Sequence, residues 1–541
     1  MPRFFSILPM APRTPSPPYS SPTESAAAVE PSPQNTQYLS TPWNMHSKWW
    51  WLGLLYFASW MFLPALLATS LPLDVVEGIT WGHAWQWGYY KHPPFSSWVL
   101  YGFYAALGNS GPFVLSQLCV LATLYFVWRL GRALGTPQQA WLGALLTLGV
   151  AYYTRPALEF NHNIAQMPIW AALGYFTFIA WQKQKTRDWV ILGMIAGFGL
   201  LTKYSVSILL IVLLGYLIIS SHGKIFLSWK FWLAFFIAAC IFAPHLLWLW
   251  ESHWLPMEYA SRRSGQAMRW PRLQALGFLG TQALNHLPLL LIVAVAFLSQ
   301  RRHLSRGAAD PNAWRTPENS YMLCLALGPG LLVTLLGVLT GARLYDMWGT
   351  PMWAFSGLLV ALWLPRSWLA TLQATLERGL LVWLVVISLL SWGFLGWGAQ
   401  LRQRPARTDW PQAALAERAR AAWHSVSTCG LDTVAGNYWI AGLAAVDTAQ
   451  PAAVLLDEDP RFSPWATAER LQQHGALWLW TEDSPPSLPA GLQPLTQTPQ
   501  ASQAAALTTH TGQFSVPWPR NPQQGQLTVH WRAWVPTGCV P

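Results

Sequence analysis

The sequence predicts a polytopic α-helical membrane protein of about eleven transmembrane helices, followed by a C-terminal soluble α/β or α+β domain. Of the 541 residues, 53% are hydrophobic and only 10% are charged, whereas a soluble protein carries about 25% charged residues. Apolar runs close to the roughly 20 residues that cross a bilayer recur up to residue 398, and none follows. We therefore expect a transmembrane part, 48–400, and a soluble part, 401–541.

The candidate spans set the expected topology. They lie near 49–69, 113–130, 138–153, 164–182, 189–202, 205–221, 231–249, 276–299, 319–340, 350–364 and 379–398. Lys and Arg concentrate in every second loop, including 183–187 and 301–306, and the positive-inside rule makes these loops cytoplasmic. The N-terminus is then cytoplasmic, and residues 401–541 lie on the outer side of the membrane.

The N-terminal segment differs in composition from the spans. Residues 1–47 are rich in Pro, Ser and Thr and cannot build a core, so we expect a disordered tail. If Met45 is the true start, residues 1–44 are not translated. The net charge of +11 is spread over short loops, with no Lys/Arg block of the kind that binds nucleic acid.

The C-terminal part has the composition of a water-exposed domain, with many Gln, Pro, Ala and Thr residues. Residues 476–480 read as a strand and 465–473 as a helix. Only two of the five cysteines, Cys429 and Cys539, lie in this part. They can form one disulfide if this part faces an oxidising compartment.

The loops assigned to the outer face hold the polar clusters that indicate chemistry. Asp74 and Glu77 follow the first span, and the block Gly88-Tyr-Tyr-Lys-His-Pro-Pro94 comes next. Ionisable side chains at a bilayer surface are costly enough to mark a functional site. The aromatic segment 94–107 is too short to span comfortably, so we expect an amphipathic helix in the membrane interface.

This block resembles bacterial membrane glycosyltransferases of the C-type fold, the relatives of aminoarabinose transferase and protein O-mannosyltransferase in glycosyltransferase families 39 and 83. The similarity covers roughly 49–400 and includes Leu201-Thr-Lys203-Tyr204, while Gly436-Asn-Tyr-Trp439 is similar to the extracytoplasmic domains of some members. The resemblance implies a bacterial inner-membrane protein whose donor is a polyprenyl-phosphate-linked sugar. The sugar would move to a hydroxyl of a lipid, glycan or protein acceptor at the periplasmic face, without a cofactor.

Asp74 is the expected catalytic base. A carboxylate in a partly dry cleft has a raised pKa and can take the proton of an acceptor hydroxyl. The alternative is a helix cap or a solvated loop carboxylate. Glu77 would share the face of Asp74 in a helix, and it is either a second catalytic carboxylate or a capping partner.

The expected ligands of the donor phosphate are basic residues of the outer loops: Lys91, His92, Lys203, Arg262 and Arg263. Related proteins tend to have lysine directly before the first proline, where this chain has His92, so the choice between Lys91 and His92 stays open. The arginines of 251–272 depart from the positive-inside pattern, and bidentate contacts to phosphate give a reason. The alternatives are anchoring to anionic lipid for the Lys91–His92 pair and a loop salt-bridge network for the arginines.

Polar side chains of the same face are the expected contacts of the sugar or the acceptor: Tyr89, Tyr90, Asn161, His162, Asn163, Tyr204 and Tyr345. Related proteins often carry an acidic residue near 161–163, where this chain has amides and a histidine, with Glu159 nearby. Asn161 is alternatively a helix N-cap. We expect no metal, because the outer-loop histidines lack a recognised ligand spacing, with a divalent cation as the alternative.

The alternative function is a lipid-sugar transporter or flippase. Such a protein would place broken helices and ionisable residues near the bilayer midplane, in two related halves. The sequence shows no internal repeat, and its polar clusters fall at one face. It therefore favours the enzyme.

Overall fold

The computed structural model of this protein describes residues 43–265, 270–304, 316–446, 451–496 and 507–541. The chain divides into two compact units, Met1–Leu55 and Tyr56–Pro541, and the second unit contains the candidate site. Most of the predicted tail, 1–47, lies outside the described residues. Helix α1 (Trp43–Leu67) begins at Trp43, so the boundary predicted at residue 47 is too late.

Six helical segments of the described residues are long and apolar enough to cross a membrane, and the predicted count of eleven is not confirmed. A bent pair of helices would make a seventh span, α11 (Pro271–Asn285) and α12 (Leu287–Gln300), which meet at 50°. The six segments are α1, α3 (Phe95–Leu107) continued by α4 (Gly111–Leu134), α6 (His162–Lys183), α9 (Trp229–Glu251), α13 (Pro317–Thr340) and α15 (Arg366–Gly396).

The remaining predicted spans fall on shorter helices: α5 (Pro137–Thr147), α7 (Thr186–Thr202), α8 (Val206–Ser221) and α14 (Ser356–Trp363). An apolar run indicates that a segment is buried, but the segment can be buried against other helices as well as in lipid. In α7, for example, a Cβ on Gly193 would lie 2.5 Å from the carbonyl oxygen of Ala234 in α9. Small residues thus let α7 and α9 pack closely. The predicted span 350–364 is interrupted because Asp346–Trp353 forms the 3-10 helix η7, with Pro351 inside it.

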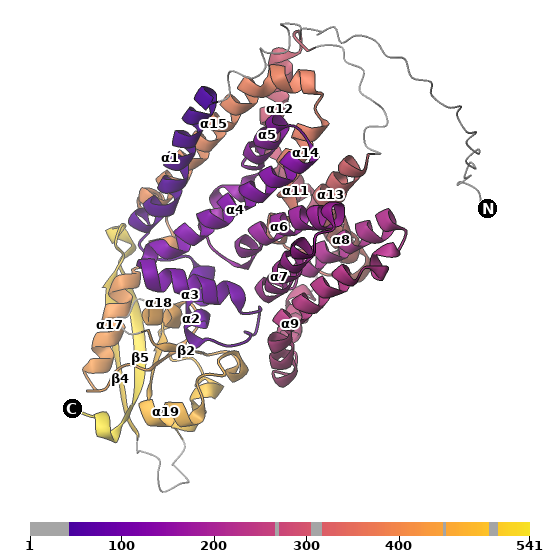
Figure 1. Ribbon diagram of the computed structural model, residues 1–541. Helices are drawn as coiled ribbons and strands as arrows, with labels where there is room; N and C mark the ends of the chain where they lie inside the picture. Colours follow the sequence, from indigo (N-terminus) through magenta and orange to yellow (C-terminus); the bar gives the residue numbers. More distant parts are fainter. Residues whose placement is uncertain (1–42, 266–269, 305–315, 447–450, 497–506) are drawn as a thin grey trace, which may run out of the picture. The chain divides into compact units, whose positions relative to one another are not determined.

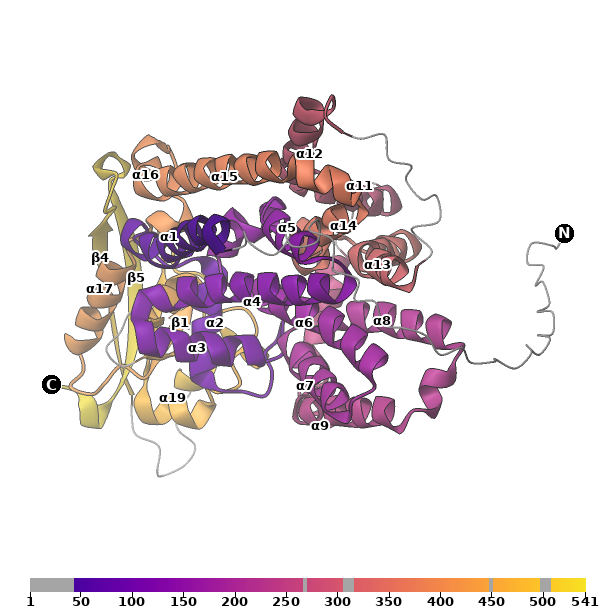
Figure 2. The same ribbon diagram turned by 45° about the horizontal axis from the view of Figure 1, so that its top comes forward.

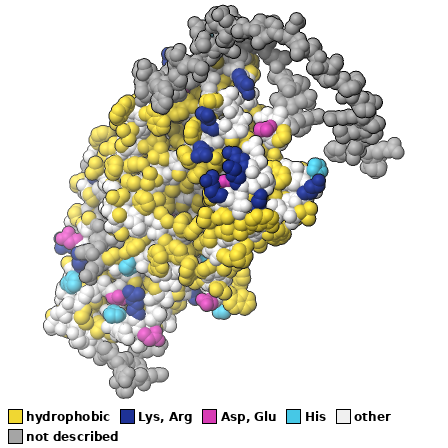
Figure 3. Space-filling view, viewed as in Figure 1, with side chains coloured by type: hydrophobic (Ala, Val, Ile, Leu, Met, Phe, Trp, Pro, Cys, Tyr) yellow, Lys and Arg dark blue, Asp and Glu magenta, His cyan; other side chains and the backbone are white. Residues whose placement is uncertain are grey.

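Short elements lie between the spans, and they carry four of the predicted site residues: Asp74, Glu77, Arg262 and Arg263. These elements are α2 (Leu73–Ala84), η3 (Ala151–Tyr153), η4 (Arg155–Leu158) and α10 (Leu255–Ser264). In Figures 1 and 2, α2 and α3 lie between the C-terminal sheet and the helices α4 and α7. Figure 3 shows a largely hydrophobic face over the helical part, with Lys and Arg gathered in one area of it, as expected for helices that face lipid.

The C-terminal part is a mixed sheet with helices. Its strands are β1 (Thr433–Gly436), β2 (Ala453–Leu456), β3 (Ala476–Trp480), β4 (Leu507–Pro517) and β5 (Gln526–Pro536), in the order β2-β1-β3-β5-β4. β1 runs parallel to β2 and β3, whereas β5 is antiparallel to β3 and β4. The helices are α17 (Gln412–His424), α18 (Ile440–Val446) and α19 (Ala468–His474). The strand predicted at 476–480 is β3, and the predicted helix 465–473 begins three residues late, as α19.

The sheet part docks on the helical part through backbone contacts. Helix α18 packs on α2, where a Cβ on Gly442 would lie 2.7 Å from the side chain of Val76. The Leu71 N–H donates to Gln412 Oε1 at 2.7 Å, just before α2 begins. At the end of α15, the Arg520 guanidinium donates to the Leu395 carbonyl at 2.7 Å. These contacts place both parts in one compact unit.

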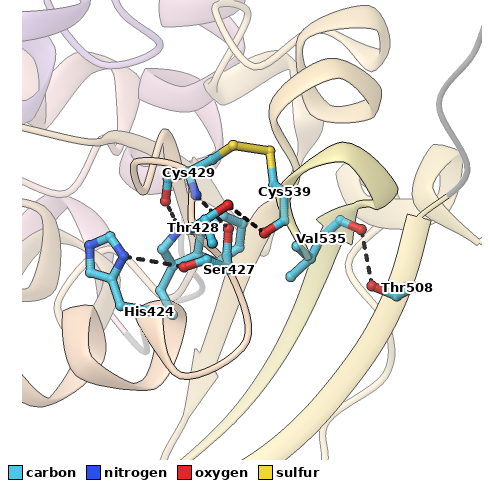
Figure 4. The surroundings of a disulfide bond; sticks show 8 residues. His424, Ser427, Thr428, Cys429, Thr508, Val535 and Cys539 are labelled. Carbon is cyan, nitrogen blue, oxygen red and sulfur yellow. Dashed lines mark hydrogen bonds between the residues drawn. A yellow bond between two sulfur atoms is a disulfide. The ribbon is translucent and has the colours of Figure 1, made fainter. Parts of the chain in front are cut away.

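A disulfide joins Cys429 to Cys539 and so fixes the end of the chain (Figure 4). The Thr428 N–H also donates to the Cys539 carbonyl at 2.7 Å. The bond closes a loop with a sequence separation of 110 residues, which contains the whole sheet. A cross-link of this kind stabilises a fold chiefly by limiting the unfolded chain.

Replacing both Cys429 and Cys539 by Ser should lower the thermal unfolding midpoint of the purified protein, since the disulfide contributes about 2–4 kcal/mol. The measurement is tryptophan fluorescence during heating in detergent. Cys240→Ser, at an exposed free cysteine of α9, is the matched control and should leave the midpoint unchanged. Equal midpoints for the double variant and the parent would show that the disulfide contributes nothing.

Candidate active site

Two carboxyl groups from distant segments meet at the start of α2. Asp74 lies in the first turn of this helix, where the positive end of the helix dipole favours a carboxylate. The Asp74 N–H donates to Glu159 Oε1 at 3.4 Å. Glu159 comes directly after η4, so the fold pairs residues that are 85 positions apart.

Burial and mutual repulsion shift the pKa of both carboxyl groups upward. Burial raises the pKa of Glu159 to about 7, and the charge of Asp74 adds to the effect. Burial also raises the pKa of Asp74, with Glu77 adding to it, while basic residues that include Arg407 and Lys203 oppose the rise. The pair therefore holds a proton near neutral pH and can exchange it, as a general base must.

Lys91 is enclosed in an ion pair. Its Nζ lies 2.6 Å from Glu77 Oε1, and the two side chains are 16% and 10% exposed. The ammonium also lies 5.0, 5.1 and 5.6 Å from the ring centres of Tyr90, Tyr438 and Tyr259. Burial lowers the pKa of Lys91, but Glu77, Tyr259 and Tyr438 together oppose it and the net pKa is raised. This geometry favours a positioning role over the roles predicted for Lys91 as a phosphate ligand and for Glu77 as a catalytic carboxylate.

His92 and His162 form a buried stack. Their ring centres are 4.0 Å apart, and Trp81 lies against both rings. Burial, then the neighbouring His162 and the charges of Lys203, Lys91 and Arg263, holds the pKa of His92 well below its usual range. His92 is therefore a neutral imidazole, which argues against the predicted cation. Within the described ranges, Nε2 of His162 is buried without a hydrogen-bond partner, so it is available to a ligand.

Lys203 is the cation beside Asp74. It follows the last residue of α7, and its Nζ donates a hydrogen bond to Asn163 Oδ1. Burial lowers the pKa of Lys203 to about 8, and the charge of Asp74 opposes that effect. Asn161 caps α6, because its Oδ1 accepts from the N–H groups of Asn163 and Ile164 at 2.9 and 3.2 Å. For Asn161 the structure thus supports the N-cap alternative.

A histidine that sequence reasoning missed fixes two site segments. His245 in α9 is fully buried, with its Nε2 2.9 Å from the Tyr204 hydroxyl and its Nδ1 2.6 Å from the Trp87 carbonyl. A carbonyl oxygen only accepts, so Nδ1 carries the hydrogen and Nε2 accepts from Tyr204. This chain of bonds occupies the Tyr204 hydroxyl and ties the loop before Lys91 to the turn that holds Lys203.

The two arginines of α10 diverge. Arg262 is exposed and lies 3.6 Å from Glu258. Arg263 lies 4.6 Å from the ring centre of Tyr345, whose hydroxyl donates to the Arg263 carbonyl at 3.5 Å. The Arg263 charge also lowers the pKa of His92. Of the predicted pair, Arg263 is the one whose charge acts on His92.

Tyr89 and Tyr90 are part of the wall of the site. Tyr89 stacks on Trp81 with ring centres 5.0 Å apart and donates its hydroxyl to the Trp81 carbonyl at 2.5 Å. Tyr90 stacks at 4.0 Å on Phe462 from the C-terminal part, and its hydroxyl donates to Glu77 at 3.2 Å. Both hydroxyls are already used, so the contacts support packing more than the predicted sugar binding.

Comparison with known proteins identifies the fold. Residues 91–248 match the family model described as dolichyl-phosphate-mannose-protein mannosyltransferase. The structure of ArnT from Cupriavidus metallidurans bound to undecaprenyl phosphate superposes with a TM-score of 0.60 and 13% identity, over 90% of this chain and 98% of ArnT. The chain has the C-type glycosyltransferase fold. The resemblance drawn from the Asp74–Pro94 block is therefore confirmed.

The sequence relatives of this C-type-fold protein are named as glycosyltransferases. The lipopolysaccharide core galacturonosyltransferase RgtA of Rhizobium johnstonii is 27% identical over 388 residues, which cover 67% of this chain and 74% of RgtA. RgtB of the same organism is 27% identical over 306 residues, which cover 53% of this chain and 59% of RgtB. These relatives support a transferase activity on a multi-pass membrane protein.

The candidate site contains three further residues that the sequence analysis did not predict as site residues: Glu159, His245 and Arg407. Glu159 is the only carboxylate in the predicted outer loop 154–163, a signal that could have selected it over the neighbouring amides. Arg407 lies in the connection to α17, and no sequence pattern ties it to Asp74. Within the described ranges, no group of three or more His, Cys, Asp or Glu side chains is placed to hold a metal ion.

The Lys91–Glu77 pair should behave as a structural unit. Lys91→Met and Glu77→Gln should each lower the thermal unfolding midpoint, because breaking a buried pair costs about 3–5 kcal/mol. The double variant should recover much of that loss, since no buried charge is left alone. The exposed Arg262–Glu258 pair is the control: Arg262→Gln should change the midpoint little. Additive losses in the double Lys91/Glu77 variant would show that the two residues act independently.

Proposed function

We propose that this protein transfers a sugar from a polyprenyl-phosphate donor to an acceptor hydroxyl at the periplasmic face of a bacterial inner membrane. The observation that carries the proposal is the Asp74–Glu159 carboxylate pair beside the cation of Lys203. ArnT was solved with undecaprenyl phosphate, and RgtA and RgtB are named galacturonosyltransferases. Undecaprenyl phosphate is therefore the first donor lipid to test, and galacturonic acid the first sugar.

The proposed reaction is a displacement at the anomeric carbon. Asp74 takes the proton of the acceptor hydroxyl, and the hydroxyl oxygen forms the new bond to the anomeric carbon. The bond between that carbon and the phosphate oxygen breaks, and its electron pair leaves with polyprenyl phosphate. Because the hydroxyl attacks one face of the anomeric carbon and the phosphate leaves from the opposite face, the anomeric configuration is inverted. The proton on Asp74 then passes to solvent.

Lys203 and Arg263 are the cations that we assign to the departing phosphate. Lys203 is buried and its charge acts on Asp74, and the charge of Arg263 on α10 acts on His92. Fixed cations at the point where charge develops stabilise the transition state. The free Nε2 of His162 is positioned for a hydrogen bond to the sugar.

Two independent features support the proposed side of the membrane. The Cys429–Cys539 disulfide requires an oxidising compartment, which supports a periplasmic C-terminal part. The basic loops 183–187 and 301–306 support the same topology. The alternative, a lipid-sugar transporter, is less favoured because Asp74, Glu159 and Lys203 lie outside the six candidate spans, whereas transporter sites lie at the midplane.

The transfer assay tests the proposal. Purified protein in nanodiscs receives radiolabelled undecaprenyl-phosphate galacturonic acid and glycolipids extracted from bacterial envelopes. Asp74→Asn should reduce transfer about 10²–10⁴-fold, because the amide keeps the shape and removes the base. Glu417→Gln, on the exposed surface of α17, is the control and should keep full activity. If Asp74→Asn stays within tenfold of the parent, Asp74 is not the base.

Glu159→Gln should move the acidic limb of the kcat/KM pH profile to lower pH. In the parent, burial raises the pKa of both carboxyl groups, that of Glu159 to about 7, and the two charges repel each other. With Gln at 159 the repelling charge is gone, so Asp74 ionises at lower pH. An unchanged acidic limb would show that Glu159 does not share the proton of Asp74.

A further inference from the structure

The turn that begins at Lys203 is anchored to α6 by its first and third side chains. Lys203 Nζ donates to Asn163 Oδ1, and the Ser205 hydroxyl donates to Gln166 Oε1 at 2.9 Å. Asn163 and Gln166 are both buried in α6. These two bonds leave the middle residue of the turn to be held from elsewhere.

Tyr204, the middle residue, is anchored to a different helix. Its hydroxyl donates to Nε2 of His245 in α9 at 2.9 Å, and Nδ1 of His245 donates to the Trp87 carbonyl at 2.6 Å. The His245 side chain is fully buried. Both of its ring nitrogens are used, so a single imidazole joins the turn at 203–205 to the loop that leads into the Lys91–His92 pair.

Trp248, on the same side of α9, supports that loop as well. Its ring stacks on His245, with ring centres 5.6 Å apart and ring planes at 14°. Gly88 packs so closely on this ring that a Cβ at Gly88 would lie 2.2 Å from a ring carbon of Trp248. The loop is therefore fitted to the surface that His245 and Trp248 form, and a side chain at position 88 would not fit there.

The two segments that His245 joins carry charges of the proposed site. The charge of Lys203, at the start of the turn, acts on Asp74, on His92 and on His162. A cation stabilises a departing phosphate only where it is held at the point at which charge develops. A displacement of about 1 Å can cost roughly 10²-fold in rate. A residue that fixes these segments relative to each other thus affects the reaction without touching the substrate.

We propose that His245 is a positioning residue for the sugar transfer, because its two hydrogen bonds hold the turn of Lys203 and the loop of His92 in one arrangement. His245 acts through these two segments and not on the substrate itself. This inference rests on the proposed transfer and goes beyond it. It assigns a functional role to a residue inside a candidate membrane span, α9.

Two variants of His245 each keep one of its bonds. In His245→Gln the amide oxygen can take the place of Nε2 and accept from Tyr204, whereas in His245→Asn the amide nitrogen can take the place of Nδ1 and donate to the Trp87 carbonyl. Tyr204→Phe removes the hydroxyl alone. These variants of the full-length protein are compared in nanodiscs by the transfer assay.

His245→Asn and Tyr204→Phe should each lower kcat/KM by about 10- to 10²-fold, because each releases the turn of Lys203. The double variant should be no worse than either single variant, since both changes break the same bond. His245→Gln should keep more activity than His245→Asn, because it can still accept from Tyr204.

The basic limb of the kcat/KM pH profile separates positioning from a general loss of fold. Burial lowers the pKa of Lys203 to about 8, so activity that needs this cation falls above that pH. An ammonium that is released from its place gains water, and its pKa rises towards the ordinary value. The basic limb should therefore move to higher pH in His245→Asn and in Tyr204→Phe.

His286→Asn is the matched control. His286 also bonds through both ring nitrogens, with Nδ1 2.8 Å from the Gln282 carbonyl and Nε2 2.9 Å from the Ser356 hydroxyl, but it has no bond to the turn of Lys203. His286→Asn should lower the thermal unfolding midpoint and leave the basic limb where it is.

Lysine acetylation measures the position of Lys203 without any activity. The variants are treated with acetic anhydride, and mass spectrometry gives the labelling rate of Lys203 relative to the exposed Lys185 of the same molecule. Lys203 should be labelled faster in His245→Asn and in Tyr204→Phe than in the parent. In His286→Asn its relative rate should equal that of the parent.

An unchanged basic limb, or unchanged labelling of Lys203, in His245→Asn and Tyr204→Phe would overturn the inference, however much rate is lost. Additive losses in the double variant would overturn it too, because the two residues would then act separately. A parent that transfers no sugar would contradict the proposed function instead, and the labelling rates alone would then decide whether His245 positions Lys203.

Discussion

The buried ion pair between Lys91 and Glu77 fixes the arrangement on which the candidate site depends. Removing two charges from water is costly, and the cost is offset only where the contact is short and the surroundings are fixed. Here the contact is 2.6 Å, and tyrosine rings surround the ammonium. Glu77 comes from α2, Tyr259 from α10 and Tyr438 from the C-terminal part. Because three separate segments meet at one ammonium, none of them can move without exposing a buried charge.

This pairing also explains why two acidic residues on one helix differ in their chemistry. Glu77 faces a cation and serves as its counter-ion. Asp74, three residues earlier, donates its backbone N–H to Glu159, and both carboxyl groups have raised pKa values. The environment of each carboxyl therefore sets its role, with one group paired to a lysine and the other ready to exchange a proton. The neutral stack of His92 and His162 extends the dry surroundings of that pair.

The sequence was informative where local composition determines structure and less so where tertiary contacts do. The apolar residues of 476–480 define a buried strand, and the Asp74–Pro94 block was enough to recognise the fold. The predicted count of eleven spans is not confirmed, and runs such as 189–202 bury their side chains against protein as well as lipid. Glu159 and His245 were missed because their partners lie 85 and 41 positions or more away in the chain. Only the folded chain shows that the amides at 161–163 serve as a cap and a lysine partner.

The C-terminal part completes the site and does more than cover it. Gln412 binds the backbone at Leu71, and so fixes the chain just before the turn that carries Asp74. The connection to α17 brings Arg407 to a cavity that Glu159 also lines, and its course is set by the Arg402–Asp409 ion pair and by the Asp409 bond to the Ala406 N–H. Phe462 and Tyr438 close the wall around Lys91. A C-type helical part without these residues would lack a fixed start of α2 and the Arg407 charge that acts on both carboxyl groups. The sheet is thus coupled to the chemistry through the positions of Asp74 and Arg407.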